Sequence, residues 1–309
     1  MGPETVKPRH IIEFVAFQFI AFLVQLLPLS VVRKMGRGLG RFVYVRIGYR
    51  KEVTLNNLRR AFPEKSETEL IGIARGAFEN IGISLLELAW FPRMTRQEIL
   101  EEMRFDNPGI LKNAYEKGKG VICLTAHFGN WELLGQALAV RFQYPLSGLA
   151  KTQSNRLVNE QINRRRKLFG TKVIPMETSL RELIRALGDG EMVMIAADQA
   201  APKENVPMEF FGTMVPTHTG PAALSLRMGS AIVAIFAVRS SDGSYDAHLI
   251  EVPSEDLEGH TDKNVVELTR RHVKITENII RQYPDQWLWM HKRWKHVPLP
   301  ETHSGEAGT

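Results

Sequence analysis

Short apolar runs alternate with polar or helix-spaced segments along most of this chain. Five runs are mostly apolar and have the length of buried strands: VICLTA (121–126), PLSGLA (145–150), KVIP (172–175), MVMIAA (192–197) and AIVAIFAVR (231–239). Strands that alternate with helices form parallel sheets with helices on both faces. We therefore expect an α/β fold with a central, mostly parallel sheet flanked by helices.

The clearest predicted helix begins at Ser66, which forms a capping box with Glu69. Apolar residues at helical spacing continue it to about Ala89, and Phe91-Pro92 ends it. Further helices are predicted from Asn130 onward and over residues 154–169, 179–187, 222–227 and 263–281. Because no repeat or linker interrupts this pattern, residues 33–297 are expected to form a single domain.

The N-terminal region differs from the rest because residues 11–32 are nearly all apolar. IIEFVAFQFIAFLVQLLPLSVV approaches the length of about 20 residues that crosses a bilayer, although it contains Glu13, Gln18 and Gln25. It has no signal-peptide cleavage site, so we expect it to be retained. Residues 1–32 are predicted to form a membrane-anchoring helix that spans the bilayer or lies in its surface; the alternative is a buried hydrophobic helix. Residues 298–309 are predicted to be a disordered tail.

The net charge of +6 and the pI near 9.4 favour acidic partners. Basic residues follow the apolar segment closely: Arg33, Lys34, Arg37, Arg41, Arg46, Arg50, Lys51, Arg59 and Arg60. This pattern suits anionic headgroups on the cytoplasmic face of a membrane, or else is a solvated face. A nucleic-acid partner is not expected, because it would not explain the apolar N-terminus. The single cysteine, Cys123, lies in an apolar run and is predicted to be a core residue.

Two polar residues follow predicted strands directly. His127 comes after VICLTA and Asp198 after MVMIAA. Ligands of open α/β sheets bind beyond the carboxyl ends of the strands, so these side chains meet there if the strands are neighbours. A carboxylate that holds one imidazole nitrogen would let His127 act as a general base. The alternative is a histidine that only satisfies its own loop.

Glu132 lies five residues after His127, at the start of a predicted helix. Both can border one pocket if His127 lies in the loop before the first turn. Free backbone N–H groups near residues 128–131 would then be available to an anion. A metal site is not expected, because further histidine or cysteine ligands at suitable spacing are missing.

The stretch TAHFGNWE resembles the H-x4-D/E box of glycerolipid-type acyltransferases, and most closely the bacterial lipid A biosynthesis late acyltransferases. Three more stretches are similar to that group and occur in the same order: INRRRKLFG from Ile162, MEFFGTMVPTHTG from Met208 and YPDQWLWMHKRWKH from Tyr283. With the N-terminal segment they cover nearly the whole chain.

The resemblance implies roles for individual residues. His127 would be the catalytic base, and Glu132 would either orient it or pair with a basic residue on the following helix, best matched by Arg165. Asp198, in AADQ, is the other possible partner of His127. Gln199-Ala200-Ala201 stands where relatives often have an aspartate-rich run, which leaves the acceptor open.

Substrate-binding residues are expected around this pair: Asn130, Lys151, Arg164 and Arg165. Lys151 follows the strand PLSGLA, where it could meet an acceptor phosphate or simply be exposed. At least one member of the basic cluster 164–167 should point inward. Of the tryptophans near the C-terminus, Trp287 is expected in the core and Trp294 at the membrane interface.

The resemblance therefore implies a membrane-associated O-acyltransferase on the cytoplasmic face of the bacterial inner membrane. It would move an acyl chain from acyl carrier protein or coenzyme A to a hydroxyl of a lipid A precursor or similar glycolipid, with no further cofactor. Two alternatives stay open. One is another acceptor, such as a phosphoinositide mannoside or a lysophospholipid; the other is a non-catalytic lipid-binding protein.

Overall fold

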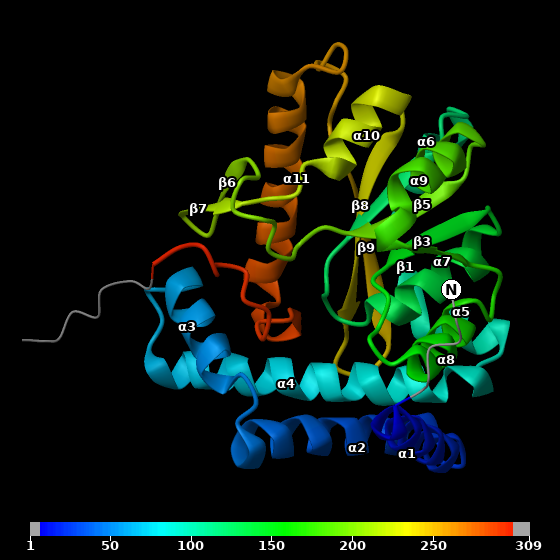
Figure 1. Ribbon diagram of the computed structural model, residues 1–309, viewed down its shortest axis with the longest axis vertical. Coiled ribbons are helices and arrows are strands. Elements are labelled where there is room, and N and C mark those ends of the chain that lie inside the picture. The colour runs from blue at the N-terminus through cyan, green and yellow to red at the C-terminus, as the bar shows by residue number, and fades with distance from the viewer. Residues whose placement is uncertain (1–6, 299–309) are drawn as a thin grey trace, which may run out of the picture.

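A seven-stranded sheet forms the centre of the molecule (Figure 1). The computed structural model describes residues 7–298, so nearly all of the predicted C-terminal tail lies outside the described residues. The strand order is β1-β9-β8-β2-β5-β3-β4. The strands are β1 (Met103–Phe105), β2 (Val121–Thr125), β3 (Leu146–Ala150), β4 (Lys172–Pro175), β5 (Met192–Ala196), β8 (Ala231–Arg239) and β9 (Tyr245–Glu251).

All neighbouring strands of this sheet are parallel except β8 and β9. The five predicted strands are confirmed, and with them the single α/β domain. Sequence reasoning missed β1 and β9, as well as a two-stranded antiparallel sheet of β6 (Pro207–Phe210) and β7 (Thr213–Pro216). At the turn between β6 and β7, Phe211 and Gly212 have φ values of 51° and 67°.

Alternate residues of the central strands face two separate cores. In β2, Ile122 and Leu124 pack on one side, whereas Val121 and Cys123 pack on the other. The first side is covered by α9 (Ser179–Gly188), α10 (Gly220–Met228) and α11 (Asp262–Gln282), and the second by α5 (Arg96–Glu102), α6 (Gly109–Glu116) and α7 (Trp131–Phe142). Cys123 is buried as predicted, and burial raises the pKa of its thiol to about 12.

Helix α4 (Glu67–Trp90) contributes to both cores. Its capping box at Ser66 and Glu69 is present as predicted, because each residue satisfies a backbone N–H of the other. The remaining α-helices are α1 (Pro8–Gln25), α2 (Leu29–Phe42), α3 (Lys51–Ala61) and α8 (Arg156–Arg166). A π-helical turn, η1 (Val43–Ile47), follows α2. The short 3₁₀ turns are η2 (Phe91–Arg93), η3 (Met176–Thr178) and η4 (Pro284–Gln286).

The N-terminal apolar segment forms two helices rather than one. Pro28 stands between α1 and α2, and α2 crosses the boundary predicted between residues 32 and 33. Both helices lie on the side of α4 that faces away from the sheet (Figure 1). Among residues 7–298, no helix is both long and apolar enough to cross a membrane.

Glycines allow α2 and α4 to pack with their backbones nearly in contact. A Cβ at Gly40 would lie 2.1 Å from the carbonyl oxygen of Phe78, and a Cβ at Gly36 would lie 2.6 Å from the Cα of Ile83. Such distances are shorter than any carbon contact, so only glycine fits at these positions. The backbone of α2 therefore packs directly against the backbone of α4.

Trp294 is only 5% exposed and packs against Trp289 and Phe210. The prediction that it lies at an interface is wrong, because the C-terminal segment folds back onto the α11 side of the sheet and encloses the ring. Trp287 is buried, as predicted.

Candidate active site

His127 follows β2 at the carboxyl edge of the sheet, and Asp198 follows the neighbouring strand β5. Thr125 and Ala196 are paired in register, which brings the two side chains together. The imidazole Nδ1 lies 2.8 Å from Asp198 Oδ1, and the His127 backbone N–H donates to Oδ2 at 3.1 Å. Asp198 is thus the carboxylate that holds the ring.

Asp198 is almost completely buried, and it receives a third hydrogen bond from the Trp287 indole N–H at 2.8 Å. Burial by itself would raise the pKa of Asp198, but the charge of His127 and these hydrogen bonds outweigh it and lower that pKa. Likewise, burial would lower the pKa of His127, whereas the charge and hydrogen bond of Asp198 raise it above its ordinary value. An ionised Asp198 therefore fixes Nδ1 as the protonated nitrogen and leaves Nε2 as the basic one.

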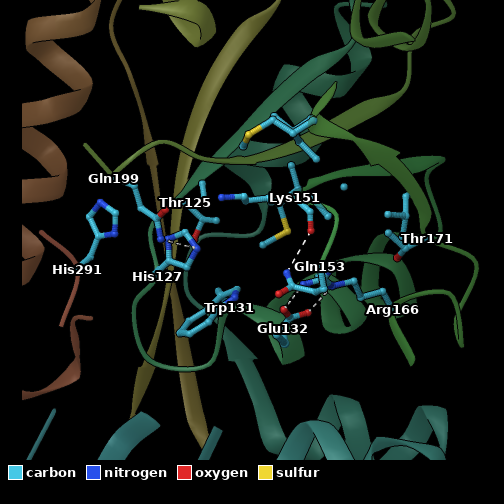
Figure 2. Close-up of a pocket in the computed structure, with 18 of the residues that line it drawn as sticks. Thr125, His127, Trp131, Glu132, Lys151, Gln153, Arg166, Thr171, Gln199 and His291 are labelled. Carbon is cyan, nitrogen blue, oxygen red and sulfur yellow. Dashed lines mark hydrogen bonds and ion pairs between the residues drawn. The ribbon is translucent and has the colours of Figure 1, made fainter. Parts of the chain in front are cut away.

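The Nε2 edge of His127 faces a cavity of about 490 Å³ (Figure 2). The imidazole side chain is 24% exposed, and the indole of Trp131 packs against it edge-on. The side-chain nitrogen of Gln199 lies 3.3 Å from Nε2. The ring thus has one nitrogen held by protein and the other accessible to a ligand.

The backbone of the His127 loop is fixed by hydrogen bonds and by close packing at Gly129. Leu288 N–H donates to the His127 carbonyl, and the Gly129 N–H donates to the carbonyl of Gln286. Gly129 has φ of 53°, and a Cβ there would lie 1.7 Å from the Ala237 carbonyl oxygen, so no other residue fits. The Phe128 N–H donates to Ala126. Residues 128 and 129 therefore do not provide the free N–H groups that were predicted.

Three polar residues on one face of α4, Asn80, Ser84 and Glu87, form hydrogen bonds to the same loop. Asn80 and Ser84 donate to the Gly129 carbonyl at 3.1 and 2.9 Å, and Glu87 accepts from Asn130 Nδ2 at 2.7 Å. The three residues are spaced by four and three positions and so share one helix face. The apolar pattern of this helix did not reveal them.

Glu87 is buried and neutralised by two arginines. It accepts from Arg33 of α2 at 2.7 Å and from Arg239 of β8 at 3.3 Å. Burial would raise the pKa of Glu87, but the charges of Arg239 and Arg33 lower it. Arg33 is therefore an internal ion-pair partner, not part of a basic surface.

Asn130 caps α7 and is fully buried. Its side-chain oxygen accepts from the Leu133 N–H, while its nitrogen is bound to Glu87. Both ends of the amide are thus used inside the protein. The prediction that Asn130 contacts substrate is not supported by this placement; instead it fixes the start of the helix.

Glu132 faces the cavity and forms a bidentate ion pair with Arg166 of α8, at 2.9 and 2.6 Å. It makes no hydrogen bond to His127 among the described contacts. Of the two roles left open for Glu132, pairing with a basic residue is the one observed. The predicted partner, Arg165, is wrong by one position.

Arg165 is buried, with its guanidinium over the ring of Phe17. Arg164 is exposed, and neither residue lines the cavity. Consecutive helical residues point about 100° apart, so the packing of α8 selects which arginine reaches Glu132. Lys151 does line the cavity, at the carboxyl end of β3, and its side chain is exposed there.

The histidine held by buried Asp198 lies beside a cavity at the carboxyl edge of the sheet and begins the H-x4-E stretch, which resembles the box of the glycerolipid-type acyltransferases. Comparison with known families agrees. The chain belongs to the bacterial lipid A biosynthesis acyltransferase family, whose sequence model matches residues 2–296. It is therefore an acyltransferase that transfers an acyl chain to a lipid hydroxyl.

The chain is similar over almost its whole length to two Escherichia coli K12 proteins. It is 28% identical to lipid A biosynthesis palmitoleoyltransferase, covering 97% of this chain and 96% of the relative. It is 26% identical to lipid A biosynthesis lauroyltransferase, covering 95% and 94%. A phosphatidylinositol mannoside acyltransferase of Mycolicibacterium smegmatis is 26% identical over 49% of this chain and 51% of the relative.

Proposed function

We propose that His127 is the general base of acyl transfer from a thioester to a glycolipid hydroxyl. The observation that carries this proposal is the hydrogen bond of Nδ1 to buried Asp198, which leaves Nε2 directed into the cavity. Nε2 takes the proton of the acceptor hydroxyl as its oxygen attacks the thioester carbonyl carbon. The carbon–sulfur bond then breaks and the imidazolium returns the proton to sulfur, giving an ester and a free thiol.

Asp198 stays ionised throughout and stabilises the imidazolium. Gln199 moves from Nε2 when the hydroxyl binds, and its amide can then donate to the developing oxyanion. The donor is acyl carrier protein or coenzyme A; the acidic carrier protein suits the basic charge of this chain. Lys151, exposed at the edge of the cavity, is placed to meet a phosphate of either substrate.

A second, mainly apolar cavity of about 460 Å³ provides a place for the acyl chain. It shares Leu149, Met176, Ala196 and His218 with the first cavity and extends between α9 and α10. Leu180, Leu183 and Leu224 are among its walls. We call this cavity the apolar arm. A hydrocarbon chain that lies in the apolar arm can present its carbonyl carbon near His127.

We also propose that α1, α2 and η1 bind the cytoplasmic face of the bacterial inner membrane. Of the 24 large hydrophobic residues that are exposed among residues 7–298, 15 lie between Ile11 and Tyr49. An exposed apolar surface of this extent beside basic residues such as Lys34 and Arg46 is typical of helices lying in the headgroup region. Lipid substrates would thus be reached without leaving the membrane.

Membrane binding is tested by sedimentation with vesicles that contain anionic phospholipid. Phe19→Glu and Phe22→Glu change residues that are 61% and 59% exposed on α1, and they should reduce the bound fraction. Val266→Glu, at an exposed site on α11, is the matched control and should bind as the wild type does. Equal binding of all variants would contradict this orientation.

The reaction is tested with acyl carrier protein thioesters of several chain lengths and total membrane lipid as acceptor. His127→Ala should abolish acyl transfer while the circular dichroism spectrum and melting temperature stay close to those of the wild type. His248→Ala is the matched control, because His248 forms a similar 2.8 Å contact with Asp106 at the surface. A folded His127→Ala protein with wild-type activity would refute the proposal.

The mycobacterial relative supports a second acceptor, a phosphoinositide mannoside. Lipid mass spectrometry of a deletion strain separates the two, because each acceptor would lose an acyl chain from a different molecule.

A further inference from the structure

Three buried polar side chains around the cavity each have an atom without a hydrogen-bond partner. These atoms are Thr125 Oγ1, Gln136 Oε1 and Thr171 Oγ1, on residues that are 3%, 2% and 7% exposed. Only seven such atoms occur among the side chains that the structure describes, so the presence of three of them around one cavity is a distinct feature. Buried polar groups in folded proteins are almost always paired with protein, water or a ligand, so these three groups lack a partner that a molecule in the cavity could supply.

The three residues line a continuous part of the cavity on the α7 side of the sheet. Figure 2 shows Thr125 and His127 at one end and Thr171 at the other, with Glu132 and Arg166 between them. Glu132 and Arg166 neutralise each other along this stretch, so apart from exposed Lys151 its side chains offer hydrogen bonds rather than net charge.

Two glycines keep this part of the cavity open. A Cβ at Gly148 of β3 would lie 3.8 Å from the Thr171 methyl group, and a Cβ at Gly135 of α7 would lie 3.5 Å from Met194 Sδ. Both spaces are free because neither residue has a side chain. We call the region lined by Thr125, Gly135, Gln136, Gly148 and Thr171 the polar trench.

The polar trench and the apolar arm lead away from His127 on different sides of the sheet. The trench follows α7, whereas the apolar arm runs between α9 and α10. A transfer reaction must hold two substrates at one base, and the thioester's hydrocarbon chain suits the apolar arm. The trench, with hydroxyl and amide groups, suits a ligand rich in hydroxyls.

We infer that the polar trench binds the hydroxylated sugar portion of the acceptor through Thr125, Gln136 and Thr171. This inference rests on the proposed function and adds to it the side from which the acceptor approaches. Thr125 lies close to His127 in the chain and so contacts the part of the acceptor nearest the reacting hydroxyl. Thr171, at the far end, contacts a part that does not react, and it is a specificity residue.

The test uses isosteric substitutions in the full-length protein. Thr171→Val and Thr125→Val remove a hydroxyl and keep the shape, and Thr171→Ser restores the hydroxyl. Rates are measured with lauroyl-acyl carrier protein and a purified lipid A precursor, each varied in turn. Loss of one neutral hydrogen bond should raise the KM for the precursor about fivefold in either valine variant, and Thr171→Ser should stay within about twofold of the wild type.

Thr269→Val is the matched control. Thr269 is buried on α11, and its hydroxyl donates to the Val265 carbonyl of the same helix rather than facing the cavity. Its kinetic constants should equal those of the wild type. If the valine variants raise only the KM for the donor, the trench holds the pantetheine amides and the inference is wrong. It is equally wrong if neither KM changes. Wild-type protein that transfers no acyl chain would instead refute the proposed function, which is measured first.

Discussion

Replacing Asp198 by Asn should remove most of the catalytic power of His127 while keeping the shape of the site. Asp198 accepts hydrogen bonds from His127 Nδ1, the His127 N–H and the Trp287 indole. Proton transfer to Nε2 creates an imidazolium beside this carboxylate. For charge centres about 4 Å apart and an effective dielectric constant of about 20, their attraction is about 4 kcal/mol, or roughly 10³-fold in rate.

The neutral amide also changes which nitrogen of the imidazole carries the proton. If the nitrogen of the new amide faces Nδ1, it donates a hydrogen bond, and the basic electron pair is then on Nδ1 instead of Nε2. We expect kcat to fall about 10³-fold in Asp198→Asn, measured as ester formation from acyl carrier protein thioester. Asp106→Asn, in the surface pair with His248, should keep full activity.

The pH profile gives an independent readout. The base must be neutral, so the wild-type rate rises with pH through the pKa of His127, which Asp198 raises above the ordinary value of 6.5. Without the carboxylate, burial lowers this pKa, so the rising limb of Asp198→Asn should shift to lower pH. A folded Asp198→Asn protein that keeps more than a tenth of the wild-type kcat, or an unchanged pH limb, would refute the reasoning.

Three further substitutions, two of them with a control variant, test the contacts that support the site. Gly40→Ala forces α2 away from α4 and should lower the free energy of unfolding by about 1–3 kcal/mol. In the control Gly38→Ala the new Cβ meets no atom within 4 Å, so this variant should raise the free energy of unfolding by about 0.5–1 kcal/mol. Equal effects in chemical denaturation would contradict the close packing. Arg166→Met leaves the half-buried carboxylate of Glu132 unpaired and should lower the transfer rate about tenfold, whereas Arg164→Met changes an exposed residue and should leave the rate unchanged. A larger loss of rate in Arg164→Met than in Arg166→Met would show that α8 is rotated. Glu87→Gln leaves two arginines without their shared carboxylate and should lower stability by about 3–5 kcal/mol, and a loss under about 1 kcal/mol in the same assay would disprove that role.

Local patterns determined the elements on which the site is built. The capping box at Ser66 satisfies backbone groups within three residues, so no distant contact is needed to predict where α4 begins. The most apolar of the five runs, β2 and β8, lie inside the sheet and are buried on both faces, where nearly every side chain must be apolar. His127 and Asp198 were found because each follows such a run, and the ends of parallel strands lie at one edge of the sheet.

What the chain could not determine by itself was which of these ends are neighbours and which side of each helix faces inward. Only the pairing of β2 with β5 makes Asp198 the partner of His127, and only the rotation of α8 brings Arg166 rather than Arg165 to Glu132. The N-terminal apolar segment was predicted as one helix. Pro28, a local helix breaker, divides it, but only the structure shows that the second part packs on α4. Strand order, helix rotation and the pairing of buried polar groups such as Glu87 depend on contacts between residues far apart in the chain. Such contacts leave no periodic signal in the sequence, and the packed structure alone decided them.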